Sequence, residues 1–341
     1  MREPTESPAT RGLSIEHLEC KLDVTYNWGY EQTRKDLRDL YKKAQRSQWT
    51  PDSTLPWDTS VDPEMPGFPE YLFPLHGSDL YAKLTEREKK NLNVELSSWM
   101  LSQFLHGEQG ALLAASQLVT SVPDTDSKYY ASTQVYDEGR HVEVYDRYLH
   151  EKIGFSYPIS KPLKQLLDLI LTDARWDMKL LGMQIMVEGL ALAAFNMIRE
   201  NTDEPLLKKL IHYVMLDEAR HVAYGVLSLK DYYNDAKESE RREREDFIYE
   251  AAVLMRDRFL FDQVWEKMGM PVEQCKQIAL QSESQRMFRQ MLFSKIVPAV
   301  KKMGLLTDRQ RARFEQLGIL QFESWADPFE SLATAEQQQV A

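Results

Sequence analysis

The sequence predicts an all-α protein, a four-helix bundle with additional N- and C-terminal helices. Long stretches repeat apolar residues at helical spacing, and short turn-forming segments separate them. No stretch shows the alternation of apolar and polar residues that is typical of a β-strand. Four long helices joined by short turns pack as a bundle, because each buries one apolar stripe against the others.

The boundaries of the expected helices follow from caps and helix breakers. A short helix is expected at about 34–46, within an N-terminal arm, residues 1–80, that is rich in Pro, Trp and Tyr. Thr85 and Glu88 form a capping box, which opens a long helix that ends near residue 121. The main helical domain is expected at 81–325, followed by a polar tail at 326–341. The other helices are expected at about 127–153, 160–199, 203–233, 237–268, 273–303 and 308–317.

The charge and the cysteine content argue against several classes of protein. The 341 residues include 42 basic and 53 acidic side chains, for a net charge of −11. We therefore expect neither nucleic acid nor an anionic membrane as the main partner. Cys20 and Cys275 have no disulfide-framework or metal-site spacing, which fits a reducing cytoplasm. The N-terminal residues lack the apolar core of a signal peptide, so a cytoplasmic location is expected.

A duplicated motif carries the expected chemistry. The pentapeptides Asp-Glu-Gly-Arg-His at 137–141 and Asp-Glu-Ala-Arg-His at 217–221 lie 80 residues apart, each inside a long predicted helix. In both, Glu and His are three residues apart and therefore share one helix face. Another glutamate precedes each motif glutamate by 30 residues, at Glu108 and Glu188. The chain thus contains two copies of one Glu…Glu-x-x-His set.

These residue types suit two iron ions, with an iron/manganese pair as the alternative. Oxygen-rich ligation with some nitrogen favours iron and manganese, and four carboxylates offset most of the charge of two divalent ions. One Glu from each of two helices plus Glu-x-x-His from each of the other two is the pattern of di-metal carboxylate bundles. The predicted metal ligands are Glu108, Glu138, His141, Glu188, Glu218 and His221.

A single Glu-x-x-His on a helix is most often a surface coincidence. Here, however, Glu108 and Glu188 lie in apolar segments, where an unpaired carboxylate is expensive. The segment 180–198 is apolar enough to resemble a membrane span, but Glu188 in its middle favours a buried helix with one functional carboxylate.

The other charged residues of the two motifs are expected to orient the ligands. A metal-bound histidine normally donates its other ring proton to a carboxylate. On antiparallel neighbouring helices, Asp217 would serve His141, and by the same pattern Asp137 would serve His221. Solvated salt bridges are the alternative. The residues expected in this outer layer are Asp137, Arg140, Asp217 and Arg220.

At these residues the chain resembles the ferritin-like superfamily of di-iron carboxylate proteins. Within it, the chain is most similar to the ligand-binding oxidases related to the small subunit of ribonucleotide reductase. Bacterial multicomponent monooxygenase hydroxylases and acyl-carrier-protein desaturases carry similar motifs. The resemblance covers about 45–230 and implies a ferritin-like bundle that activates dioxygen. The similar segments are 48–52, 103–108, 137–145, 187–192 and 217–225.

Departures from these families narrow the expected function. The ligand-binding oxidases form a valine–tyrosine cross-link, but Ala111 and Met183 occupy those positions. Leu192 replaces a threonine of the monooxygenases, and Val214 replaces a seventh ligand, a histidine, of the arylamine N-oxygenases. Tyr145 matches the radical tyrosine of the reductase subunit. The chain ends in Gln-Gln-Gln-Val-Ala rather than in the aromatic tail that docks this subunit, which favours an enzyme.

Residues about one helical turn from a ligand are expected to line an apolar cavity beside the metals. Ordinary core packing is the alternative for all of them. Tyr145 is the expected catalytic residue, as a pocket wall whose hydroxyl bonds a ligand or the substrate. The residues of this expected cavity are Phe104, Ala111, Tyr145 and Leu192.

The sequence therefore predicts a non-haem di-iron (or iron/manganese) oxygenase or oxidase. Its expected partners are dioxygen, a small apolar or amine-containing organic substrate, an electron-donor protein or reductant, and a second copy of the chain in a homodimer. Three alternatives stay open: a radical-generating subunit that oxidises Tyr145, an acyl-chain desaturase, and a metal-handling or ligand-binding protein without turnover.

Overall fold

The computed structural model describes residues 15–64 and 72–325, and every regular element in these ranges is a helix. The all-α prediction is therefore confirmed. The predicted polar tail, 326–341, lies outside the described residues.

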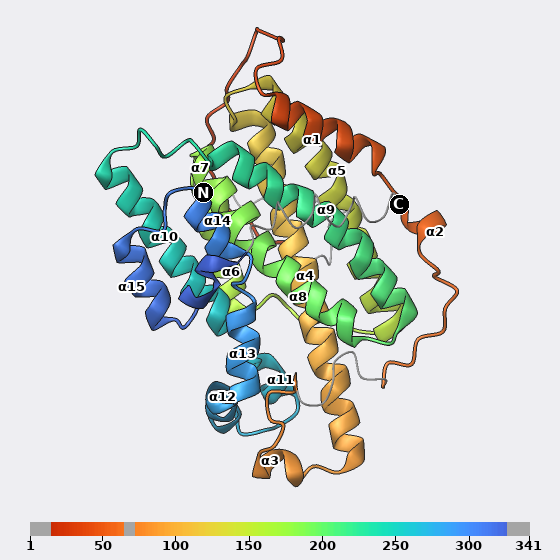
Figure 1. Ribbon diagram of the computed structural model, residues 1–341. Helices are drawn as coiled ribbons and strands as arrows, with labels where there is room; N and C mark the ends of the chain where they lie inside the picture. The colour runs from red at the N-terminus through yellow and green to blue at the C-terminus, as the bar shows by residue number, and fades with distance from the viewer. Residues whose placement is uncertain (1–14, 65–71, 326–341) are drawn as a thin grey trace.

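Two antiparallel helix pairs form the central bundle (Figure 1). The first pair is α4 (Glu86–Ser121) and α5 (Thr125–Tyr148), and the second is α8 (Glu188–Asn201) and α9 (Pro205–Leu229). The expected capping box is present, since Thr85 accepts from the backbone N–H of Glu88 and Glu88 accepts from that of Thr85. The start of α4 is thus set by its local sequence.

The third predicted helix, 160–199, is interrupted. α6 (Lys161–Thr172) ends at Asp173, whose carboxylate accepts a 2.8 Å hydrogen bond from the backbone N–H of Arg175. This local turn competes with continuation of the helix. The chain restarts as α7 (Trp176–Leu180), passes through the π-helix η3 (Leu181–Val187) and continues into α8. Only this second part belongs to the bundle, and α6 packs outside it on α4.

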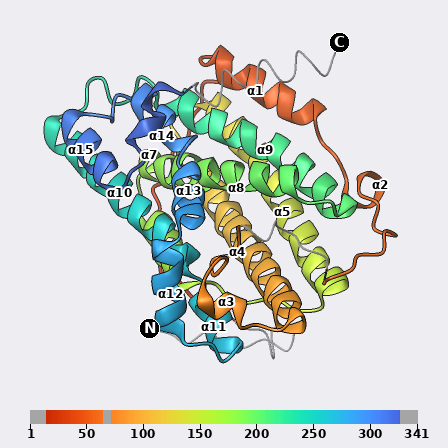
Figure 2. The same ribbon diagram turned by 60° about the horizontal axis from the view of Figure 1, so that its bottom comes forward.

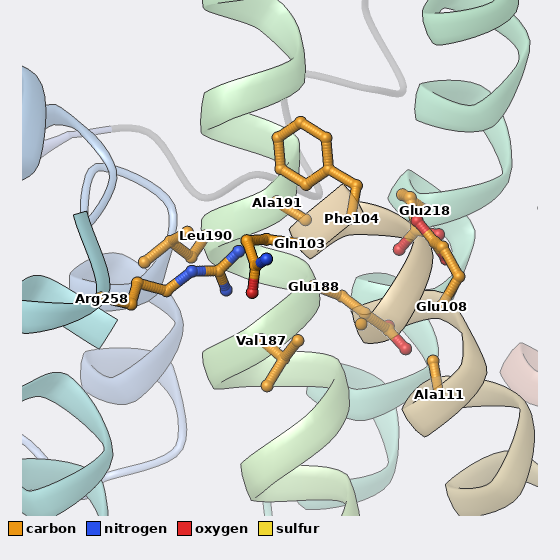
Figure 3. Close-up of a pocket in the computed structure, with 11 residues that line it drawn as sticks. Gln103, Phe104, Glu108, Ala111, Val187, Glu188, Leu190, Ala191, Glu218 and Arg258 are labelled. Carbon is orange, nitrogen blue, oxygen red and sulfur yellow. The ribbon is translucent and has the colours of Figure 1, made fainter. Parts of the chain in front are cut away.

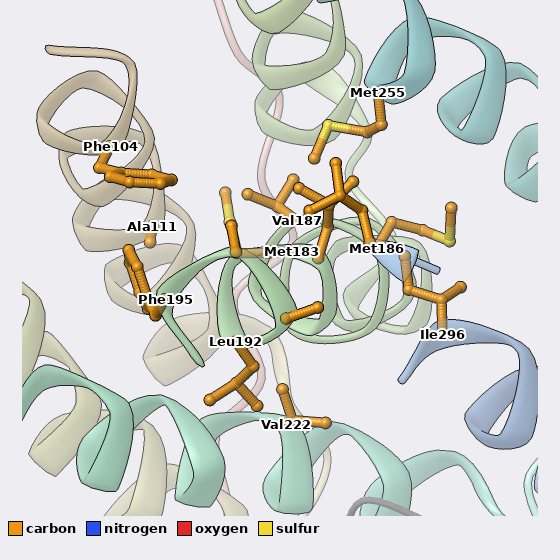
Figure 4. Packing of buried hydrophobic residues seen from close by; sticks show 14 of the residues in the cluster. Phe104, Ala111, Met183, Met186, Val187, Leu192, Phe195, Val222, Met255 and Ile296 are labelled. Atoms are coloured by element: carbon orange, nitrogen blue, oxygen red, sulfur yellow. The ribbon is translucent and has the colours of Figure 1, made fainter. Parts of the chain in front are cut away.

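The π-helix η3 packs closely against α9 at Gly225. A Cβ on Gly225 would lie 2.7 Å from the Cβ of Gln184, so this approach requires a glycine. On the other side of η3, Met186 packs toward Met255 and Ile296 of the surrounding helices (Figure 4). π-helical turns contain an extra residue and are often found at functional sites. Here the turn leads directly into Glu188.

The stretch Trp176–Asn201 is long and apolar enough to cross a membrane by length and composition. However, 83% of its most apolar window is buried inside the protein. Glu188 within it is 3% exposed. This stretch is the central helix of the bundle, as the carboxylate in its middle predicted.

The fifth predicted helix, 237–268, is also interrupted. α10 (Glu238–Asp257) is followed by a 3₁₀ turn, η4 (Arg258–Leu260), and by α11 (Asp262–Lys267). Phe261 between them has a φ of 57°, in the left-handed region that a continuous helix cannot contain. The break turns the chain back toward the bundle.

The remaining helices surround the bundle (Figure 2). α1 (Lys35–Arg46) packs across α5 and α9, so this segment of the N-terminal arm is part of the packed structure. The other outer elements are α2 (Pro51–Thr54), α3 (Asp79–Ala82), η2 (Leu149–Ile153), α12 (Val272–Gln281), α13 (Glu283–Met291), α14 (Ile296–Lys302), α15 (Asp308–Gln316) and η5 (Leu320–Ser324).

Candidate metal centre

The structure brings all six predicted ligand residues together in the middle of the bundle. Each is at most 6% exposed. Their potential ligand atoms form two overlapping groups, and within each group all atoms lie within 4.8 Å of one another. Glu138 belongs to both groups. The first group is Glu108, Glu138, His141 and Glu218, and the second is Glu138, Glu188 and His221.

The two histidines point the same ring nitrogen into the carboxylates. His141 Nδ1 lies 3.1 Å from Glu218 Oε1 and 3.2 Å from Glu108 Oε2. His221 Nδ1 lies 3.1 Å from Glu138 Oε1 and 3.5 Å from Glu218 Oε1. This geometry directs each Nδ1 at the carboxylates, where it could bind a cation, while each Nε2 faces away from the cluster.

The donor atoms of the cluster suit bound cations. Both oxygens of Glu218, Oε2 of Glu138, Oε2 of Glu188 and Nδ1 of His221 make no hydrogen bond to any described residue. Burial, with the neighbouring charge of Glu218 next, raises the pKa of Glu108 and of Glu188 well above the usual range. Buried polar groups without partners are destabilising. Two divalent cations of the iron or manganese type would satisfy these atoms, so the residues fit such a pair.

The outer aspartates meet the histidines in a crossed arrangement. Asp217 Oδ2 lies 3.1 Å from His141 Nε2, and Asp137 Oδ2 lies 3.4 Å from His221 Nε2. Arg140 donates to both aspartates, at 2.5 Å to Asp137 and 2.7 Å to Asp217. All four of the outer charged residues are at most 5% exposed, which argues against solvated salt bridges. Arg220 donates to the other oxygen of Asp217.

The arm completes this outer layer. Trp49 Nε1 donates to Asp217 Oδ2 at 2.8 Å, and Gln48 Nε2 donates to Asp137 Oδ1 at 2.9 Å. The Trp49 ring also lies 4.5 Å from the guanidinium carbon of Arg140. The sequence analysis identified the 48–52 segment only by its similarity to the ligand-binding oxidases and predicted no role for these side chains. Their placement depends on how the arm folds over the bundle.

Gln134 is a third residue at the centre that the sequence did not predict. Its Nε2 donates at 2.9 Å to Glu138 Oε1 and at 2.9 Å to Glu188 Oε1. It lies one turn before Glu138 on the same helix face. This spacing could have predicted its role, because an amide one helical turn from a ligand glutamate can donate a hydrogen bond to that carboxylate.

A narrow cavity opens beside the cluster (Figure 3). Phe104 and Ala111 line it, as predicted from helix spacing. Leu192 does not line it, contrary to expectation, and points toward Val222 of α9 instead (Figure 4). Successive residues of a helix are rotated by about 100° around its axis. Leu192 therefore lies on the side of α8 that faces α9, whereas Ala191 lies on the side that faces the cavity. The remaining lining residues are Gln103, Gly107, Glu108, Val187, Glu188, Leu190, Ala191, Glu218 and Arg258.

Tyr145 lies behind the cavity wall. Its ring centroid is 6.0 Å from that of Phe104 and 6.1 Å from that of Phe195. Its hydroxyl is buried and makes no hydrogen bond to a described residue, so the expected bond to a carboxylate is not formed. Burial, and next the charge of Glu108, raises its pKa well above 10.

Comparisons with known proteins agree with this geometry. A protein-family model described as p-aminobenzoate N-oxygenase AurF matches residues 30–304. No curated protein matches the sequence. A solved R2-like ligand-binding oxidase with an aerobically reconstituted metal cofactor, after photoconversion, is 16% identical over 78% of this chain and 93% of that chain, with a TM-score of 0.50. A variant R2-like ligand-binding oxidase with an aerobically reconstituted Mn/Fe cofactor is 16% identical over 79% and 93%, also with a TM-score of 0.50. At this identity the likeness shows the ferritin-like fold alone.

The family match spans most of the chain and includes every residue of the carboxylate–histidine cluster. The protein is therefore an oxidoreductase that uses dioxygen and a di-iron or iron/manganese cofactor, and the chain belongs to the AurF family of p-aminobenzoate N-oxygenases.

Proposed function

We propose that this protein transfers one oxygen atom from dioxygen to the nitrogen of a small amine. The family match over 30–304 is the observation that carries the proposal. In the balanced first step, R–NH₂, O₂, two electrons and two protons give R–NHOH and water. The bound metal pair supplies the redox chemistry that activates dioxygen.

The proposed ligands of the metal pair are the six clustered residues, and the surrounding side chains hold them in place. Asp217 accepts from Nε2 of His141, which leaves Nδ1 directed at the carboxylates. Asp137 does the same for His221. Phe104 forms part of the apolar wall, which excludes water and packs against the carbon skeleton of the substrate. The proposed ligands are Glu108, Glu138, His141, Glu188, Glu218 and His221.

The proposed ligand set contains six residues rather than seven. Val214, at the position of the additional histidine of the arylamine N-oxygenases, is fully buried and has no atom that binds metal. It lies one turn before Glu218 on α9. We therefore propose that the side of the pair near Val214 is apolar and has one ligand fewer.

We also propose a cytoplasmic homodimer that receives electrons from a donor protein or a small reductant. Both Cys20 and Cys275 are free thiols, which supports a reducing compartment. Light scattering of the purified protein at micromolar concentration should give twice the mass of one chain. A monomer at all concentrations would contradict the dimer.

The test of the proposed reaction is mass spectrometry of products made with ¹⁸O₂. Iron-loaded protein, a chemical reductant and p-aminobenzoate should give a product with one ¹⁸O on nitrogen. Glu138→Ala, which removes the carboxylate common to both groups, should abolish it, whereas the surface variant Glu64→Ala should not. Oxygen on carbon only, or a product that has lost two hydrogens without gaining oxygen, would contradict N-oxygenation.

A further inference from the structure

Gln134 is a buried amide that joins two of the proposed ligands. It lies on α5 and is 0% exposed. Its Nε2 donates to Oε1 of Glu138, on the same helix, and to Oε1 of Glu188, the first residue of α8, at 2.9 Å in each case. An amide NH₂ group has two N–H donors, so one glutamine can serve both carboxylates at once. Gln134 thus links the two helix pairs of the bundle at the metal centre.

Gln184 fixes the orientation of this amide. It is 0% exposed and lies in the π-helix η3, four residues before Glu188. Its Nε2 donates to Oε1 of Gln134 at 3.4 Å. The carbonyl oxygen of Gln134 therefore faces Gln184, and its NH₂ group faces the two carboxylates. Gly225 permits this approach of η3, because a Cβ at that position would lie 2.7 Å from the Cβ of Gln184.

The bonds from Gln134 restrain the second group of proposed ligands. Each of the two glutamates in this group has one oxygen held by the amide, while Oε2 of Glu138 and Oε2 of Glu188 make no hydrogen bond to a described residue. The third member, His221, is held through its Nε2 by Asp137. Every residue of the second group thus has a partner outside the group and keeps one atom available for a cation.

Glu108 and Glu218, which belong only to the first group, have no such support. Neither oxygen of Glu218 makes a hydrogen bond to a described residue. The hydrogen bond of Glu108 within the described ranges is to Nδ1 of His141, which is itself a proposed ligand atom. A cation bound to this nitrogen would replace that contact. Within the part of the chain that the structure describes, no side chain outside the centre then holds either carboxylate in one position.

The unsupported carboxylates border the narrow cavity. Glu108 and Glu218 line it, and Figure 3 shows them close together at one end. Glu188 also lines the cavity, whereas Glu138 and Gln134 do not. Dioxygen or a substrate in the cavity would therefore meet carboxylates that can change position.

We propose that Gln134 is a positioning residue that makes the two halves of the metal centre unequal. It orients the glutamates of the second group before a cation binds and so favours binding of the ion in that group. The ion of the first group, next to the cavity, is held by carboxylates that remain adjustable. Ligands that are already oriented lose less conformational freedom on binding. This inference rests on the proposed ligand set and is independent of the proposed amine oxidation.

Stepwise titration of the metal-free, full-length protein with Mn(II) tests the proposal without turnover. Electron paramagnetic resonance of the unbound Mn(II) gives the dissociation constant of each ion. Gln134→Leu, which removes the NH₂ group and nearly keeps the size of the side chain, should weaken one ion by about 10- to 100-fold. The other ion should lose much less, because only Glu138 is common to both groups. Gln184→Leu should weaken the same ion by a smaller factor, since its bond to Gln134 is long.

Anomalous X-ray scattering from crystals grown with one Mn(II) per chain shows which ion is affected. Gln134→Leu should lower the ratio of occupancy in the second group to occupancy in the first group. The control Gln310→Leu removes an amide on α15 that is also 0% exposed and makes no hydrogen bond to a described residue. It should match the wild type in both measurements.

Three results for Gln134→Leu would overturn the assignment: wild-type affinity for both ions, an equal loss for both ions, or a larger loss in the first group. Thermal unfolding of the metal-free variants identifies a damaged fold. If Gln134→Leu does not fold, Gln184→Leu decides by the same measurements, since its loss must also fall on the second group.

Three outcomes separate this inference from the proposed function. If p-aminobenzoate is not oxidised, yet Gln134→Leu weakens the ion of the second group, the amine reaction fails and the positioning role stands. If Glu138→Ala still binds two ions, the proposed ligand set fails, and the positioning role fails with it. If Glu138→Ala loses metal but Gln134→Leu binds both ions as the wild type does, the ligand set stands and the positioning role fails.

Discussion

Asp217 accepts hydrogen bonds from four side chains around the metal centre. Its replacement therefore tests how strongly the outer layer supports metal binding. Its Oδ2 accepts from Trp49 at 2.8 Å and from Arg140 at 2.7 Å, and it lies 3.1 Å from Nε2 of His141. Its Oδ1 accepts from Arg220. The positive partners, acting against burial, hold the pKa of Asp217 far below its usual value, so it is a carboxylate at neutral pH.

Asp217→Asn replaces one of these oxygens with an NH₂ group. In either orientation of the amide, its NH₂ group faces at least one N–H donor, from Trp49, from one of the arginines or from His141. A hydrogen bond to a charged group contributes about 1.5–3 kcal/mol. Loss of the carboxylate behind a ligand histidine typically lowers metal affinity by about 10- to 100-fold, or about 1.4–2.8 kcal/mol. These two values agree, so we expect Asp217→Asn to lower the metal affinity by one to two orders of magnitude.

Asp137→Asn is the matched comparison, and its effect should be smaller. The Asp137 Oδ2 hydrogen bond to His221 Nε2 is longer, at 3.4 Å against 3.1 Å for Asp217 and His141, and Asp137 accepts from Gln48 rather than from a tryptophan. Asp177→Asn is the control for general damage, because Asp177 is equally buried and accepts from Arg244, but lies in another part of the fold.

The assay is competition of each variant with a chelator for Fe(II) and for Mn(II), which gives the dissociation constant of each metal. Circular dichroism should show the same helix content in all variants. Two results would refute the reasoning: an Asp217→Asn protein with wild-type metal affinity, or an Asp177→Asn protein that loses as much affinity as Asp217→Asn.

Three further predictions address the ligands, the buried tyrosine and a buried lysine. Elemental analysis should find close to two transition-metal ions per wild-type chain and far fewer in Glu138→Ala; one zinc per chain in both would contradict the di-metal centre. Tyr145→Phe should change the free energy of unfolding by about 1 kcal/mol or less, because the lost hydroxyl makes no hydrogen bond. Electron paramagnetic resonance should show no stable tyrosyl signal in the air-exposed wild type, and a signal that disappears in Tyr145→Phe would support the radical-subunit alternative. Burial lowers the pKa of Lys179 to about 8, so the folded protein binds this proton more weakly than the unfolded chain does. Chemical denaturation should therefore show the wild type gaining up to about 3 kcal/mol relative to Lys179→Met as the pH rises from 8 to 10.5, and parallel pH profiles would contradict this.

The sequence by itself determined the helices and the composition of the centre. Caps such as Thr85–Glu88 act within one turn, and residues three apart share a helix face whatever surrounds the helix. Two copies of Glu…Glu-x-x-His on four amphipathic helices therefore have one compact way to bury their carboxylates, around a shared cation site. Glu138 and His221, 83 positions apart, were predicted to meet for this reason.

Only the tertiary structure decided which other side chains reach the centre. The turn at Asp173 and the left-handed Phe261 each divide a stretch that has helical periodicity on both sides, so periodicity could not locate the breaks. Trp49 reaches Asp217 across 168 positions because the arm folds over the bundle, and nothing local sets that contact. Leu192 faces away from the cavity while Arg258 faces into it, because the packing of neighbouring helices selects which side of each helix borders the empty space. Local rules fix the direction of a side chain relative to its own helix, whereas a cavity is a property of several helices at once.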